Sequence, residues 1–207
     1  MQTIIFQGDS ITDVCRDRDN DTTFGLGYPH LIAAEVGFDC PGAYRFLNRG
    51  VSGDRVIDVY ARVKEDIINL RPDVLSILIG VNDVWHELNE QNGIDTAKYE
   101  RIYGMMIEEI KAALPQIKIM ILEPFITHGA ATDPKWDVFF GDVADHAAAA
   151  KRTAERYDLT FVPLQSAFDA ACEKAPAGYW TQEGVHPTTA GHELIAREWL
   201  RAFETLK

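Results

Sequence analysis

Short, nearly continuous apolar runs alternate along this chain with segments of helical periodicity, and this alternation restricts the fold more than any other feature. A strand that is apolar at successive positions suits a sheet covered on both faces. Right-handed crossovers place the intervening helices over the two faces of a parallel sheet, so the alternation predicts an α/β domain. The runs are TIIF at 3–6, RFLNRGVS at 45–52, DVLSILIG at 73–80, IKIMILEPF at 117–125 and LTFVPL at 159–164.

The segments between these runs predict helices. Apolar residues recur at helical spacing over 56–70 and 99–113, and the alanine-rich stretch 143–157 predicts a third helix. An irregular loop, THGAATDPKWD at 127–137, follows the fourth predicted strand. Ligands of open parallel sheets bind beyond the carboxyl ends of the strands, so we expect this loop beside a binding site. A last helix carries its buried side chains at Leu194, Ile195, Trp199 and Phe203.

The charge of the chain argues against two classes of partner. A formal net charge of -12, with no Lys/Arg-rich run to offset it, opposes binding to nucleic acid and to anionic membrane surfaces. The longest apolar stretch, residues 74–81, is far too short to span a bilayer. We therefore expect a small or neutral substrate, and neither nucleic acid nor a membrane as a partner.

The length of the chain indicates the number of domains, and the cysteines indicate the cellular compartment. A chain of 207 residues predicts one domain over 1–207 that buries its core without metals or disulfides. Cys15, Cys40 and Cys172 are widely spaced and form no CxxC pair, so neither a disulfide framework nor a zinc ribbon is predicted. With no leader-like N-terminus, this predicts a cytoplasmic protein. An export leader removed before residue 1 would leave the same pattern.

The first apolar run stops abruptly in TIIFQGDSIT, residues 3–12. Gly8 permits a tight turn that a side chain would obstruct, so Ser10 falls just past the end of the first predicted strand. Taken alone, Asp9, Ser10 or Thr12 would most often only cap the helix that follows. Whether Ser10 is a helix cap or a catalytic group therefore depends on which residues follow the other predicted strands.

Residues suited to acyl transfer follow the other predicted strands. Gly53 lies in NRGVSGDR, Asn82 in IGVNDVW, and Glu183 and His186 in EGVHP. A serine becomes a good nucleophile when a neutral histidine takes its proton and a carboxylate or carbonyl holds that histidine. The oxyanion that forms needs donors already aimed at it, and the N–H groups of Ser10 and Gly53 and the Asn82 amide are of the right type.

These segments resemble, in order and spacing, the four signature blocks of the SGNH (GDSL-type) hydrolase superfamily. The matching segments are GDSIT, the Gly53 segment, GVND at 80–83 and VHP, and the resemblance covers nearly the whole chain. It implies that Ser10 is the nucleophile, that Gly53 and Asn82 contribute to the oxyanion hole, and that His186 is the general base. More narrowly, IGVNDVW, EPF, AFDAA and VHPTTAGHELIAR resemble carbohydrate acetylesterases, including acetylxylan esterases.

The predicted architecture is a three-layer α/β/α domain of flavodoxin-like topology. Its five parallel strands take the order 2-1-3-4-5, and the site lies at the crevice between the first and third strands, which is the topological switch point.

The acid position departs from the family pattern. Most relatives have aspartate three residues before the histidine, whereas this chain has Glu183. A glutamate is one methylene longer, so its carboxylate must fold back or shift the turn to reach Nδ1 of His186. A triad of Ser10, His186 and Glu183 is favoured because the imidazolium needs a counter-charge. The alternative is a dyad in which a backbone carbonyl accepts the Nδ1 proton.

No metal or cofactor is predicted. His192 lies six residues after His186, but no HExxH or paired ligand spacing accompanies it, so it is interpreted as a structural hydrogen-bonding residue. Trp85, Trp136 and Trp180 lie close to the motifs or in the long loop, and rigid aromatic faces suit sugar rings, so they are predicted to bind substrate. The alternative is that two or more of them are buried packing residues.

The predicted activity is hydrolysis of small acyl esters, with O-acetyl groups on carbohydrate such as xylo-oligosaccharides as the substrate. A thioesterase, lysophospholipase or arylesterase could use the same residues and would prefer longer acyl chains. A non-catalytic module that binds a sugar or a nucleotide on the same fold is a hypothesis of another class. Symmetric homo-oligomers are common among soluble enzymes, so self-association is compatible with all of these hypotheses.

Overall fold

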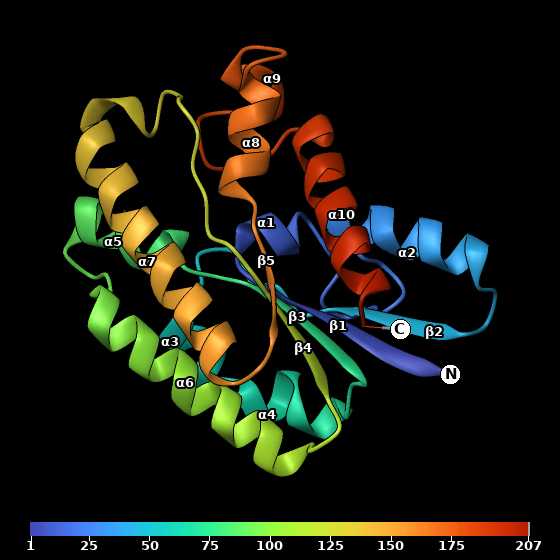
Figure 1. The fold of residues 1–207 in the computed structure, drawn as a ribbon. Coiled ribbons are helices and arrows are strands. Elements are labelled where there is room, and N and C mark those ends of the chain that lie inside the picture. The colour runs from blue at the N-terminus through green and yellow to red at the C-terminus, as the bar shows by residue number, and fades with distance from the viewer. Residues whose placement is uncertain (207) are drawn as a thin grey trace.

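A five-stranded parallel sheet forms the centre of the structure, a computed structural model that describes residues 1–206 (Figure 1). The strand order is β2-β1-β3-β4-β5, and every pairing is parallel, which confirms the predicted order 2-1-3-4-5. The first strand extends beyond its predicted run at both ends, whereas the other four strands are shorter than their predicted runs, because the end of each of those runs continues into a loop at the carboxyl edge. The strands are β1 (Gln2–Gly8), β2 (Tyr44–Asn48), β3 (Val74–Leu78), β4 (Lys118–Leu122) and β5 (Thr160–Val162).

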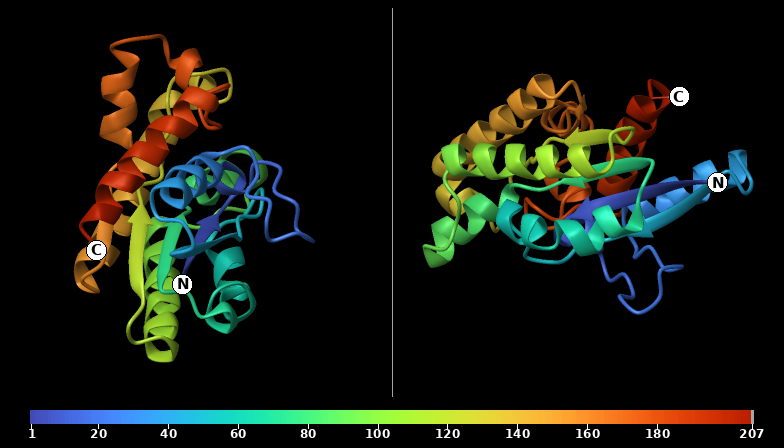
Figure 2. Two further views of the ribbon diagram at one scale, coloured as in Figure 1. Left: turned by 90° about the vertical axis from the view of Figure 1, so that its right-hand side faces the viewer. Right: turned by 90° about the horizontal axis from the view of Figure 1, so that it is seen from below.

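Both faces of the sheet are buried, as the continuous apolar runs predict. Successive residues of β1 point to opposite faces: Ile4 and Phe6 belong to one core cluster and Ile5 to the other. The first cluster lies under α2 (Tyr28–Asp39), α8 (Gln165–Cys172) and α10 (Thr189–Glu204). The second lies under α3 (Val56–Ala61), α4 (Val63–Asp66) and α6 (Thr96–Ala113), and α7 (Trp136–Arg156) contributes to both. The two turned views make the three layers visible (Figure 2).

The helix predicted over 56–70 is divided into three short pieces, so that prediction was wrong in its continuity. The helices α3 and α4 are followed by the 3-10 turn η1 (Ile68–Leu70), with non-helical backbone at Arg62 and Ile67 between them. Six of the residues from 56 to 68 are β-branched, and such residues lose rotamer freedom in a helix. The predicted apolar stripe still packs on the sheet, through Val56, Val59, Val63 and Ile67.

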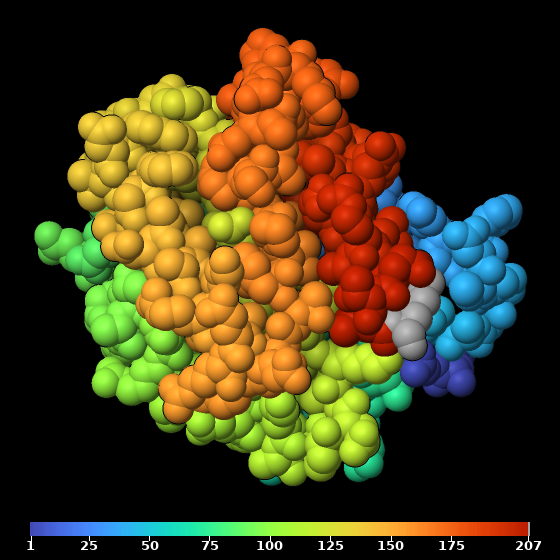
Figure 3. All heavy atoms as spheres, in the orientation of Figure 1, coloured from blue at the N-terminus to red at the C-terminus, as the bar shows by residue number. Residues whose placement is uncertain are grey.

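Other helices extend or add to the predicted set. The alanine-rich helix begins at Trp136 rather than 143, because the end of the predicted 127–137 loop is already wound into η2 (Asp133–Lys135) and α7. The sequence reading did not predict α2, α8, α5 (Val81–Glu90) or the single turns α1 (Ser10–Asp13) and α9 (Ala177–Trp180). The helices α7, α8 and α10 cover the face seen in Figure 3. Among residues 1–206, no helix combines the length and apolar character needed to cross a membrane.

Candidate active site

The Ser10 side chain is presented at the carboxyl end of β1 by a turn too tight for a side chain at Gly8. A Cβ added to Gly8 would lie 2.3 Å from the Leu78 carbonyl oxygen and 2.4 Å from Oγ1 of Thr12. The strand ends there, Asp9 caps the next helix by accepting the Ile11 N–H (2.9 Å), and α1 begins at Ser10. The predicted cap is therefore Asp9, and the hydroxyl of Ser10 is left for another partner.

That partner is His186, 176 residues away in the sequence. The distance from Ser10 Oγ to His186 Nε2 is 2.8 Å, and the distance from His186 Nδ1 to Glu183 Oε1 is 2.5 Å. An ionised carboxylate can only accept hydrogen bonds, so the Nδ1–H donates to Glu183 and Nε2 is left to accept the serine proton. The structure thus joins Ser10, His186 and Glu183 in one hydrogen-bonded chain.

Glu183 reaches the imidazole by folding back over its own turn. Its Oε1 accepts both the backbone N–H of His186 (2.9 Å) and the Nδ1–H of the same residue. The side chain is 27% exposed and the His186 side chain 36% exposed, so the pair lies at the protein surface within reach of a ligand. The extra methylene is accommodated in this way without a shift of the histidine from the serine.

The other two predicted oxyanion donors, Gly53 and Asn82, lie in the segments that follow β2 and β3. The loop that follows β2 is fixed to the end of β1 by the hydrogen bond from Val51 N–H to the Gly8 carbonyl (2.9 Å), and it carries Gly53 at the surface. Asn82, in the first turn of α5, is buried and donates from Nδ2 to the Asp54 carbonyl (3.0 Å). One of its two amide N–H groups is thereby fixed, which orients the other.

The segment that carries Glu183 is held by the loop after β4. The N–H of Thr127 donates to the Gly184 carbonyl (2.8 Å), and the N–H of Ala131 donates to the Glu183 carbonyl (2.9 Å). A Cβ added to Gly129 would lie 2.2 Å from the carbonyl carbon of Glu183. The 127–132 part of the predicted irregular loop therefore lies directly against the Glu183 backbone, and the sequence did not predict this close contact at Gly129.

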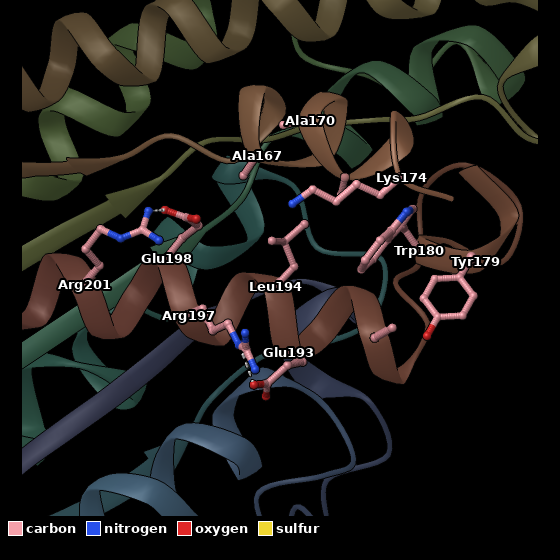
Figure 4. A pocket seen from close by; sticks show the side chains of 12 residues that line it. Ala167, Ala170, Lys174, Tyr179, Trp180, Glu193, Leu194, Arg197, Glu198 and Arg201 are labelled. Atoms are coloured by element: carbon pink, nitrogen blue, oxygen red, sulfur yellow. Dashed lines mark hydrogen bonds and ion pairs between the residues drawn. The ribbon is translucent and has the colours of Figure 1, made fainter. Parts of the chain in front are cut away.

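The three predicted tryptophans lie in different surroundings. The ring of Trp85 is half-buried, 5.9 Å from the imidazole of His186 between centroids. Trp136 is half-buried and stacks on His128 at 3.7 Å. Trp180 instead lines a cavity of about 490 Å³ between α8 and α10, whose lining includes neither Ser10 nor His186 (Figure 4). The structure brings only Trp85 against the serine–histidine pair, so the prediction for Trp180 finds no support in its position.

Asp9 is an unusual neighbour for a nucleophile. It is 1% exposed, and within residues 1–206 its Oδ2 has no hydrogen-bond partner. Burial raises the pKa of Asp9 to about 7, and the nearby Asp54 adds to the rise, whereas the hydrogen bond from Ile11 opposes it. Its charge state therefore changes near neutral pH.

His192 has a structural position. It is 4% exposed, and its Nδ1 accepts the N–H of Tyr28 at 3.3 Å. Burial, together with the neighbouring His186, lowers the pKa of His192 to about 4, so it is neutral near pH 7. Residues 1–206 contain no group of three or more His, Cys, Asp or Glu side chains arranged to hold a metal ion.

Comparison with known proteins places this chain in a family. The family model described as GDSL-like Lipase/Acylhydrolase matches residues 6–194. An acetylxylan esterase from Geobacillus stearothermophilus is 32% identical over 97% of this chain and 93% of its own. A crystal structure of that enzyme superposes with a TM-score of 0.87 at 30% identity, over 97% of this chain and 93% of its own. Variants of it described as catalytic mutants replace a serine or an aspartate with alanine.

A second structural relative comes from Parabacteroides merdae. This candidate GDSL-like lipase superposes with a TM-score of 0.89 at 38% identity, over 97% of this chain and 94% of its own. Relatives of this kind extend the similarity over the whole sheet and its helices rather than over the motifs alone.

Replacement of Gly129 by alanine is expected to disturb the Glu183 segment. The new methyl group would overlap backbone atoms that cannot rotate away, so we expect a loss of about 1–3 kcal/mol in the free energy of unfolding. The measurement is urea unfolding. Gly141→Ala is the matched control, since a Cβ there meets no atom within 4 Å and alanine favours its helix. Equal stability of the two variants would contradict the packing described.

Replacement of Asp9 by asparagine is expected to change how stability depends on pH. The folded-state pKa of about 7 exceeds the ordinary 3.8, so the stability that the neutral carboxyl contributes is full below pH 3.8 and is lost as the pH rises through about 7. Between about pH 5 and about pH 8, the wild type should lose roughly 2–3 kcal/mol relative to Asp9→Asn.

Urea unfolding at both pH values measures this difference. Asp19→Asn, at an exposed loop position, should follow the wild type. Parallel pH profiles for the wild type and Asp9→Asn would show that Asp9 stays ionised in the fold.

Proposed function

Because the chain belongs to the GDSL-like lipase/acylhydrolase family, we propose that it hydrolyses acetyl esters of carbohydrates through an acyl-enzyme formed on Ser10. Ester hydrolysis as such follows from the family and from its acetylxylan esterase relative. The observation that supports the assignment of the residues is the hydrogen-bonded chain from Ser10 through His186 to Glu183, with contacts of 2.8 Å and 2.5 Å.

In the first half of the proposed reaction, Ser10 Oγ attacks the acetyl carbonyl carbon and His186 Nε2 accepts the hydroxyl proton. The carbonyl π electrons move onto oxygen and give a tetrahedral oxyanion. When this intermediate collapses, the bond to the sugar oxygen breaks and His186 gives its proton to that oxygen. The sugar leaves as an alcohol, and the acetyl group remains on Ser10.

In the second half, water takes the place of the serine. His186 accepts a proton from the water while the water oxygen attacks the acyl-enzyme carbonyl. Collapse of the second intermediate returns the proton to Ser10 Oγ and releases acetic acid, so the enzyme is regenerated. Glu183 keeps the Nδ1–H of His186 in place in both halves and stabilises the imidazolium.

Donors for the oxyanion come from the three segments that follow β1, β2 and β3. The N–H groups of Ser10 and Gly53 have no acceptor within residues 1–206, and Asn82 has an amide N–H beyond the one bonded to Asp54. Fixed donors of this type stabilise the charge that forms in the transition state without having to reorganise. These groups are therefore assigned to the oxyanion hole.

The sugar part of the proposal rests on the relative and on the aromatic residues at this edge. Trp85 lies beside His186, and Trp136 and His128 form a stack whose imidazole is exposed. Flat faces of this kind suit the C–H groups of a sugar ring. We assign Trp85 to contact with the acetylated sugar, and Trp136 to a more distant part of the ligand.

A screen of acetate release tests this function. Acetylated xylo-oligosaccharides, acetylated monosaccharides and octanoyl esters are compared at equal concentration, with Ser10→Ala as the control for the nucleophile. The acetylated sugars should be cleaved fastest, and Ser10→Ala should lose at least about 1,000-fold in turnover. Faster cleavage of octanoyl esters would favour a thioesterase or lysophospholipase. Failure of an organophosphate to label Ser10 would favour a binding module.

Replacement of Glu183 by glutamine tests the triad against the dyad. Glutamine keeps the length and an acceptor oxygen but loses the charge that stabilises the imidazolium, so turnover should fall at least about tenfold. Steady-state kinetics on an acetyl ester measures this. Glu193→Gln removes one surface charge that pairs with Arg197, and it should stay within about twofold of the wild type. A fall below threefold in Glu183→Gln would make the dyad the better account.

A further inference from the structure

We infer that two buried aspartates, Asp13 and Asp83, are positioning residues that hold the turn carrying Gly53 in the geometry that oxyanion binding requires. The inference rests on the proposed function, because it concerns donors of the proposed oxyanion hole. Neither acid is assigned a contact with the reacting atoms. Each acts through backbone or hydroxyl groups of residues 52–56.

The turn at 51–54 has little packing of its own. It is closed by the hydrogen bond from Asp54 N–H to the Val51 carbonyl (3.1 Å), and Ser52 and Gly53 are exposed. Gly53 has φ +85, a left-handed conformation that glycine adopts without strain, as the third residue of a type II turn does. An exposed turn of this kind needs contacts from elsewhere to keep one N–H aimed in a fixed direction.

Asp13 holds the turn from the side of the nucleophile. Its Oδ2 accepts the backbone N–H of Ser52 (3.0 Å) and the Ser52 hydroxyl (3.0 Å), and it also accepts from the Arg18 guanidinium (3.1 Å). Asp13 is 5% exposed and belongs to α1, the same turn of helix that begins at Ser10. Burial would raise the pKa of Asp13, but the bonds from Ser52 and Arg18 outweigh it and lower that pKa, so the carboxylate is charged.

Asp83 holds the other end of the same segment. Both of its carboxylate oxygens lie 3.1–3.2 Å from the backbone nitrogen of Val56, the first residue of α3. Asp83 is fully buried and adjoins Asn82, which itself binds the Asp54 carbonyl. Burial raises the pKa of Asp83 well above its ordinary value, but an oxygen remains to accept the Val56 N–H in either protonation state.

The two contacts connect the three proposed oxyanion donors. Asp13 links the helix of Ser10 to the Gly53 turn, and Asp83 links that turn to the helix of Asn82. An error of about 1 Å in one donor can cost on the order of 100-fold in rate, so bonds that fix their relative positions affect the transition state more than substrate binding.

The experiment measures kcat, KM and boronate affinity for Asp13→Ala and Asp83→Ala, with Asp13→Asn and Asp83→Asn as conservative variants that keep one acceptor oxygen. A small alkylboronic acid is the probe, because its tetrahedral adduct with a serine mimics the oxyanion intermediate. We expect kcat to fall about 10- to 100-fold, KM to change less than about threefold, and boronate affinity to fall in parallel with kcat. The asparagine variants should recover most of the loss.

The matched control is Asp73→Asn. Asp73 also accepts a backbone N–H, that of Thr3 (2.7 Å), but at the amino edge of the sheet and away from residues 51–56, so kcat should stay within about twofold. Folded alanine variants with kcat and boronate affinity within threefold of the wild type would overturn the inference. Should Asp83→Ala fail to fold, Asp13→Ala decides by the same criteria. An inactive wild type would instead contradict the proposed function.

Discussion

The hydrogen bond between Ser10 and His186 is the contact on which the proposed chemistry depends, and the strand order makes it feasible. Because β1 lies between β2 and β3, the chain leaves the sheet in opposite directions from the switch point, and side chains can occupy the crevice there. The residue at the end of β1 is then within reach of loops from β2 and β3. His186 arrives from the far end of the chain on a segment fixed to the loop after β4.

Much of this arrangement could be predicted because the chemistry lies at strand ends. Ser10, Gly53 and Asn82 each lie within four residues of the end of an apolar run, and parallel strands bring their carboxyl ends to one edge, so the run boundaries predict that these residues come together. The strand order was likewise predicted and confirmed. The place of His186 in the site could be predicted only from the EGVHP motif, because no strand ends immediately before this residue.

Other features could not be read from local sequence. The need for glycine at 129 comes from the Glu183 backbone, which is 54 residues away, and no pattern within the loop signals that contact. Trp180 lies four residues before Gly184, the glycine of the EGVHP segment. Its side chain nevertheless lines the cavity between α8 and α10. Proximity in sequence to a motif did not determine which side of the segment the ring would face. The division of the 56–70 helix is different, because its six β-branched residues are visible in the sequence.

The same packing explains how the long side chain of Glu183 reaches the imidazole of His186. The backbone at Glu183 is fixed by Ala131 and has no room to retreat, because Gly129 lies against it. The longer side chain therefore has to bend toward its own turn, where the N–H of His186 binds it. That bond costs the carboxylate part of its freedom but aims Oε1 at Nδ1. The length of the Glu183 side chain thus suits the position that the loop 127–132 imposes on its backbone, and this loop is not part of the EGVHP segment.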